Sequence, residues 1–243
     1  MSGWLVHWLD ILARLATGPL SMLSGRGSLM KKLPIANRRT FLTSMAAATA
    51  GMVMPETAGA GPAAGTCILG PRPGYSPQVG TLVSMLTWMR PAVTGPVKGI
   101  SQANLDYLFD VNANSIGALL LHLAATETFY QINTFDGVGV RDFPKSYDEK
   151  WGAAMDLGDR GRKTIKGHDL KFYMDAMTEV REKSLAEFKK RDDAWLMAVD
   201  EKWGWGPTNN YCKWFHVCEH ESHHAGQIDL LLKRLPGAKP SEG

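Results

Sequence analysis

Four histidines lie within nine residues near the C-terminal end of the chain, at His216, His220, His223 and His224. Imidazole is the commonest protein ligand for transition metals, so a cluster of this kind predicts metal binding. Residues three or four positions apart share a helix face, and the spacing therefore does not select among the four. The histidines that point into the protein are those that can bind an ion together with a group from another element.

A helical wheel over this segment separates the four histidines. An apolar stripe is defined by Val217, Ile228, Leu231 and Leu235. His220 and His224 fall within this stripe, whereas His223 lies at the edge of the polar face and His216 shares its direction with Arg234. The pattern predicts that His220 and His224 point inward and that the other two are dispensable for metal binding.

A third histidine, His122, lies in an apolar segment earlier in the chain, with leucines on both sides. Buried imidazoles are costly unless they find partners, and a divalent metal on neutral ring nitrogens satisfies them. Three histidines with an open fourth position are typical of a catalytic or exchangeable site. The alternative is that these are core histidines hydrogen-bonded to buried carboxylates such as Glu127 or Glu221.

Helices must position these side chains, because alternating strand patterns are absent from the sequence. Apolar periodicity, caps and helix breakers predict long helices over residues 77–90, 115–133, 169–195 and 210–235. Short helices are expected over 101–109 and 151–157, and the stretch 140–167 is otherwise loop-like. The predicted fold class is all-α: an up-and-down four-helix bundle with a long connection between the second and third helices.

Residues 1–60 comprise an N-terminal extension and a segment with the pattern of an export signal. Arg38 and Arg39 precede an apolar run from residue 44 to 54, Pro55 ends the run, and Ala58-Gly59-Ala60 supplies small residues for cleavage. The arginine pair, followed by Phe and Leu, resembles the twin-arginine motif. That resemblance implies the Tat export machinery as a partner and a periplasmic or extracellular location. The alternative is a basic patch before a buried helix.

The predicted domain organisation follows from this signal. Residues 61–75, rich in Gly, Pro and Ala, form a linker, and residues 76–237 form the helical domain. Residues 1–29 precede the signal and do not fit its pattern. A mis-called start codon explains them better than the short amphipathic helix that their tryptophan and leucine spacing also allows.

Charge and composition exclude several classes of protein. Residues 1–59 hold six of the 27 Lys and Arg and two of the 24 Asp and Glu, so the remainder has 21 basic and 22 acidic residues. This remainder has no electrostatic drive toward nucleic acid, and we expect no such partner. No apolar run reaches the roughly 18 residues of a membrane span, which excludes a polytopic membrane protein. Three cysteines are too few for a disulfide scaffold.

Residues 220–228 read His-Glu-Ser-His-His-Ala-Gly-Gln-Ile and resemble the H-E-x-H-H-x-G-Q-I signature of the DinB/YfiT-like metal-binding bundles. Residues 114–127, with His122 and Glu127, are similar to the second helix of these proteins, and 173–185 to the third. The resemblance covers roughly 76–237. It implies a four-helix bundle, often a homodimer, with a divalent ion on His122, His220 and His224. Zinc and nickel are the expected metals, and iron is a third candidate.

The resemblance implies a metal-dependent transferase or hydrolase that acts on a small molecule, including transfer of a low-molecular-weight thiol. Glu221 is a candidate base and Gln227 a candidate for orienting a ligand. Export to an oxidising compartment argues against a thiol partner and favours the alternative of a non-catalytic metal-binding or stress-related protein. A non-haem iron role ranks lowest, because the related iron enzymes carry a carboxylate where this chain has Gly226.

Overall fold

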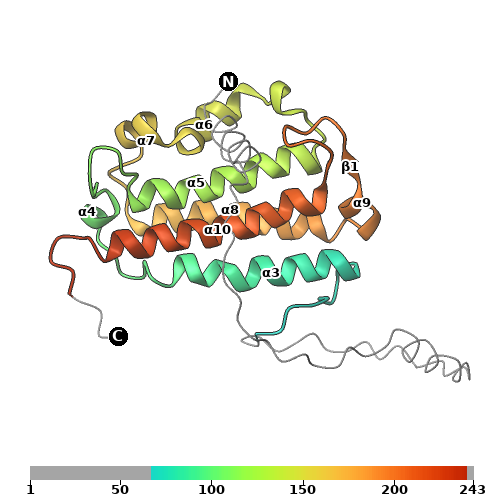
Figure 1. Cartoon of the computed structure of the whole chain (residues 1–243), viewed down its shortest axis with the longest axis horizontal. Coiled ribbons are helices and arrows are strands. Elements are labelled where there is room, and N and C mark those ends of the chain that lie inside the picture. The colour runs from blue at the N-terminus through green and yellow to red at the C-terminus, as the bar shows by residue number, and fades with distance from the viewer. Residues whose placement is uncertain (1–66, 240–243) are drawn as a thin grey trace, which may run out of the picture. The chain divides into compact units, whose positions relative to one another are not determined.

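The computed structural model describes residues 67–239, and the predicted export signal lies outside the described residues. This part of the chain is all-α, as predicted. Four long helices lie side by side (Figure 1). They are α3 (Pro77–Thr94), α5 (Ile116–Tyr130), α8 (Leu170–Phe188) and α10 (Asn210–Leu232). The predicted long connection joins α5 to α8 and returns the chain so that these two helices run in the same direction (Figure 1).

Side-chain caps start three of these helices at the expected residues. Ser115, Asp169 and Asn209 each accept a hydrogen bond from the backbone N–H three positions on, which satisfies a donor that the helix leaves open. Helix α5 is buried on nearly every side and is therefore central to the bundle. It continues into the π-helix η1 (Gln131–Phe135).

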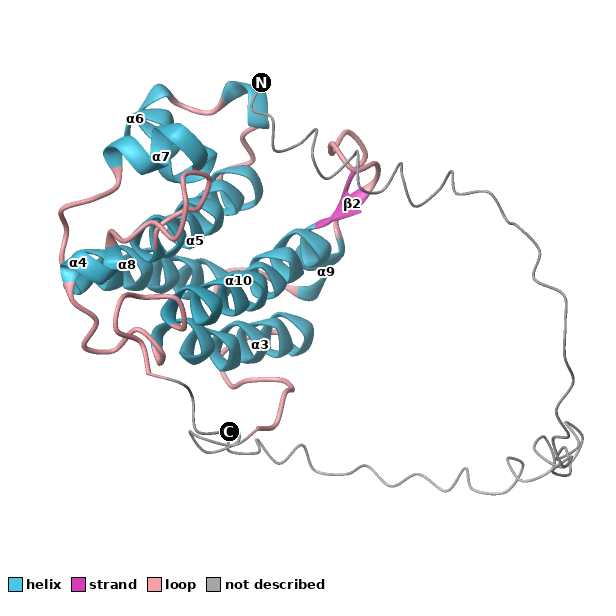
Figure 2. Ribbon diagram, turned by 60° about the vertical axis from the view of Figure 1, so that its left-hand side comes forward, coloured by secondary structure: helices cyan, strands magenta, loops and turns pink. Residues whose placement is uncertain are grey.

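The connection between α5 and α8 is more helical than predicted. It contains η2 (Val140–Asp142), α6 (Lys145–Asp156) and α7 (Gly158–Thr164), and α6 packs on α5 (Figure 2). Helix α6 buries only Trp151, Gly152 and Ala154, so its apolar face is too narrow to be recognised in the sequence. Positive φ angles at Leu157 and Gly158 separate α6 from α7.

Other boundaries also differ from the prediction. Helix α3 continues through Pro91 to Thr94 instead of ending before the proline. The third helix was expected to reach residue 195 but ends at Phe188, and the chain then forms α9 (Asp193–Met197). The predicted helix over 101–109 is reduced to α4 (Gln102–Leu105).

One unexpected antiparallel pair, β1 (Val199–Asp200) with β2 (Thr208–Asn209), frames the loop before α10. Short strands of two residues carry too little alternation to be detected. Within residues 67–239, no helix combines the length and the apolar character that crossing a membrane requires.

Candidate metal centre

The ring nitrogens of three histidines converge between α5 and α10. The Nε2 atom of His220 lies 2.9 Å from Nε2 of His122 and 3.1 Å from Nε2 of His224. All three residues are buried. Ligands around a tetrahedral zinc, each 2.0–2.1 Å from the ion, lie about 3.3 Å from one another. Both measured distances are close to this separation, and the ligand atoms of all three residues lie within 4.8 Å of one another. The residues therefore fit a shared divalent ion.

Burial keeps these imidazoles neutral. Loss of hydration lowers the pKa of His122 to about 4 and that of His224 to about 3, and mutual repulsion adds to the effect at His224. The pKa of His220 is lowered as well, by burial and then by the neighbouring histidines. Neutral rings at pH 7 retain the lone pairs that a metal needs.

The other nitrogens of two rings are fixed by hydrogen bonds. Nδ1 of His122 lies 2.8 Å from the carbonyl oxygen of Ala154 in α6, and Nδ1 of His224 lies 2.8 Å from Oε1 of Gln227. Because a carbonyl oxygen only accepts, each Nδ1 carries the proton and each Nε2 is left as the ligand atom. Gln227 was expected to orient a ligand. The backbone contribution of Ala154 could not be predicted, since a carbonyl group has no sequence signature.

The two remaining histidines of the cluster differ from each other. His223 is exposed, and its Nε2 lies 3.1 Å from the amide nitrogen of Gln227. His216 is half-buried, and its Nδ1 lies 2.9 Å from the hydroxyl of Tyr130. Its ring lies 5.0 Å from the ring of His220, so His216 is nearer to the centre than the helical wheel suggested. With Glu219 and His220 it forms a second group whose ligand atoms lie within 4.8 Å of one another.

Glu221 belongs to a buried ion-pair cluster that links all four long helices. Its Oε1 accepts hydrogen bonds from Arg90 at 2.9 Å and from Arg181 at 2.8 Å. Both arginines also bind Glu127, which accepts a further hydrogen bond from Ser184. The carboxylates of Glu127 and Glu221 thus pair with arginines. The alternative hypothesis, in which they accept hydrogen bonds from the core histidines, is not what the structure shows. A role for Glu221 as a base stays a prediction.

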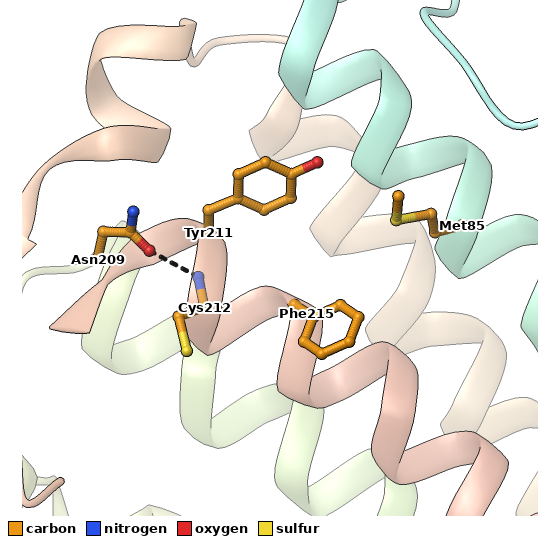
Figure 3. A pocket seen from close by; sticks show the side chains of 5 residues that line it. All are labelled: Met85, Asn209, Tyr211, Cys212 and Phe215. Atoms are coloured by element: carbon orange, nitrogen blue, oxygen red, sulfur yellow. Dashed lines mark hydrogen bonds between the residues drawn. The ribbon is translucent and has the colours of Figure 1, made fainter. Parts of the chain in front are cut away.

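A shallow hollow of about 330 Å³ lies elsewhere, between α3 and the first turns of α10 (Figure 3). Its lining comprises Met85, Asn209, Tyr211, Cys212 and Phe215. None of these five residues belongs to the histidine cluster, and their side chains are mainly apolar. The hollow is therefore separate from the candidate metal centre.

No curated protein matches the chain. Three solved chains match, among them the crystal structure of a conserved protein from Enterococcus faecalis with 14% identity and a TM-score of 0.49, covering 63% of this chain and 94% of that one.

The mycothiol-S-transferase family matches residues 81–237. This range includes α5 and α10 with all three converging histidines and supports the DinB/YfiT-like resemblance of their motifs. The chain belongs to the mycothiol-S-transferase family.

Proposed function

We propose that this protein is an exported, metal-dependent S-transferase that joins a low-molecular-weight thiol to a small-molecule acceptor. The observation that carries the proposal is the convergence of three neutral Nε2 atoms at 2.9 and 3.1 Å, from two helices of a bundle in the mycothiol-S-transferase family. Three protein ligands leave a further coordination position open, which is the arrangement of catalytic sites.

A divalent ion on these histidines would supply a Lewis acid that lowers the pKa of a thiol toward neutral pH. His122, His220 and His224 would hold the ion, and zinc or nickel suits imidazole ligands. Ala154 and Gln227 hold the proton on the opposite nitrogens of two rings. The residues of the chain therefore bind the ion and orient its histidine ligands, while the nucleophile is the thiol of the substrate.

The family name makes mycothiol the first thiol to test. Protein purified with its native metal should consume mycothiol in the presence of an alkyl or aryl halide, and removal of the ion with a chelator should abolish the reaction. Metal content, measured by mass spectrometry on the same samples, shows whether the loss of activity follows the loss of the ion. Thiol consumption that survives complete metal removal would exclude the proposal.

Export is the second part of the proposal and rests on the twin-arginine pattern at Arg38 and Arg39. Replacing both arginines by lysine should leave the precursor in the cytoplasm, and the mature protein should begin near Gly61. Unchanged export of the double variant, measured by cell fractionation, would overturn this part.

A non-catalytic metal-binding protein is the second candidate function. The export pattern favours it, because low-molecular-weight thiols are chiefly cytoplasmic and the destination is oxidising. Stoichiometric metal without turnover of any thiol or small ester would support this candidate. A homodimer and the lack of binding to nucleic acid remain proposals as well.

A further inference from the structure

Aromatic side chains lie next to the three histidines, on the side of His216. The ring of Trp205 lies 5.2 Å from that of His216, which in turn lies 5.0 Å from the ring of His220. Trp203 contacts Trp205 at 5.7 Å and Phe129 at 6.1 Å. The chain of contacts therefore runs without interruption from a metal ligand to the surface, where Trp205 is 40% exposed.

These rings meet at steep angles. Trp203 and Trp205 are inclined by 89°, and Trp205 and His216 by 72°. Rings in such a corner present both a face and an edge to a third ring, and aromatic pairs prefer edge-to-face or offset contacts. Such a corner offers a flat aromatic group both kinds of contact, which a flexible aliphatic group cannot make.

The loop that carries the two tryptophans is anchored by a buried charge. The ammonium group of Lys213, which is 2% exposed, lies 2.8 Å from Oδ2 of Asp200 and 2.9 Å from Oδ1 of Asn133. It also lies 4.1 Å from the centre of the Trp203 ring. Burial of a lysine is costly unless the charge is paired. Such an anchor holds Trp203 firmly while leaving Trp205 largely outside the core.

We propose, on the basis of the proposed function, that Trp203, Trp205 and Phe129 form a subsite that binds the flat aromatic group of the acceptor. The thiol sulfur must lie beside the histidines, and reacting atoms approach to about 3–3.5 Å before bond formation. The remainder of the acceptor then lies against the aromatic side chains next to the histidines. With an aryl chloride, the sulfur–carbon bond forms and the carbon–chlorine bond breaks. Chloride leaves with the bonding electrons, and the thiol proton passes to buffer.

Binding tests the subsite without turnover. Isothermal titration of the zinc-loaded protein should show that S-(2,4-dinitrophenyl)cysteine binds at least about tenfold more tightly than S-carboxamidomethylcysteine, since ring contacts add to buried area. Trp205→Ala should weaken binding of the dinitrophenyl compound about tenfold at unchanged zinc content, and Trp205→Phe should retain most of the affinity.

Trp88 provides the matched control, because it is a 52% exposed tryptophan on α3. Trp88→Ala should bind both compounds like the unaltered protein. Equal affinity of Trp205→Ala and the unaltered protein for the dinitrophenyl compound would overturn the subsite. Equal loss in both tryptophan variants would overturn it as well.

Turnover separates this inference from the proposed function. With one thiol, Trp205→Ala should raise KM for 1-chloro-2,4-dinitrobenzene and leave KM for iodoacetamide unchanged, with kcat little affected for either. Equal changes for both acceptors would count against the subsite. If no thiol is consumed with either acceptor while the binding difference persists, the transferase proposal fails and the aromatic subsite stands.

Discussion

At the scale of single residues, His220 occupies the middle of the candidate metal centre. Its Nε2 is the atom that lies close to both other ligand nitrogens. Removal of one ligand of three should weaken metal binding by several orders of magnitude, because the remaining pair is buried and only partly satisfied. We therefore expect His122→Ala, His220→Ala and His224→Ala to lose the ion.

His223→Ala is the matched control for these variants, since His223 is a neighbour on the same helix with an exposed ring. It should retain the metal when purified in parallel and analysed by mass spectrometry. Loss of the ion from His223→Ala together with its retention in His224→Ala would contradict the assignment of ligands.

Gln227 contacts the ring nitrogen of His224 that does not face the other two histidines. Its Oε1 accepts from Nδ1 of His224 and thereby fixes which nitrogen faces the ion. Groups in this position typically change metal affinity by about 10–100-fold. Gln227→Ala should weaken zinc binding within that range in a competition titration with a chromogenic chelator, whereas Gln227→Glu, which keeps an acceptor oxygen, should not. Equal losses in both variants would contradict the role of the acceptor.

At the scale of helices, the close approach of α5 and α8 depends on Gly117. A Cβ atom at this position would lie 2.7 Å from the ring and hydroxyl of Tyr173, which is fully buried and cannot move easily. Gly117→Ala should therefore lower the free energy of unfolding by about 1–3 kcal/mol in urea denaturation. Gly226 is the control: it lies within α10 with open space around its Cα, so Gly226→Ala should raise stability by about 0.5–1 kcal/mol. Equal effects in the two variants would contradict the packing argument.

The buried ion pairs of Glu127 and Glu221 with Arg90 and Arg181 join all four long helices. Glu127 is 1% exposed and its pKa is lowered, because the charges of Arg181 and Arg90 outweigh the effect of burial. Glu127→Gln leaves two arginines with one carboxylate and should lower the free energy of unfolding by about 3 kcal/mol. Glu179→Gln, at a side chain that is 75% exposed, should change it by less than about 0.5 kcal/mol. Similar losses would show that the cluster is not a source of stability.

At the scale of the whole molecule, the histidines link stability to pH. The pKa of His122 is about 4 and that of His224 about 3 in the folded chain, against 6.5 for an imidazole in water. Below pH 6.5 the unfolded chain takes up protons that the folded chain does not, so the free energy of unfolding falls as the pH drops toward 4.

Metal-free protein should accordingly show a Tm that is constant above about pH 7 and decreases between pH 6.5 and 4. The metal-bound form should be more stable than the metal-free form at pH 7, and the difference should diminish with acid as protons displace the ion. Thermal unfolding of both forms across this range is the measurement. A metal-free Tm that rises on acidification would contradict neutral, buried histidines.

The helical class, the four long helices and the three converging histidines could all be predicted from the amino-acid sequence. Apolar periodicity is a local property, and the inward direction of His220 and His224 follows from it directly. The caps at Ser115, Asp169 and Asn209 likewise act within a single turn, so these helices begin where the sequence predicts.

The groups that surround the histidines could not be predicted in this way, because they are brought together by the packing of the helices. Ala154 binds His122 through a backbone carbonyl on α6, a helix whose narrow apolar face the sequence does not reveal. The pairing of Glu221 with Arg90 and Arg181 joins residues that are 131 and 40 positions apart. Contacts at such separations depend on how helices pack, and packing is set by the fit of many side chains at once rather than by any local pattern.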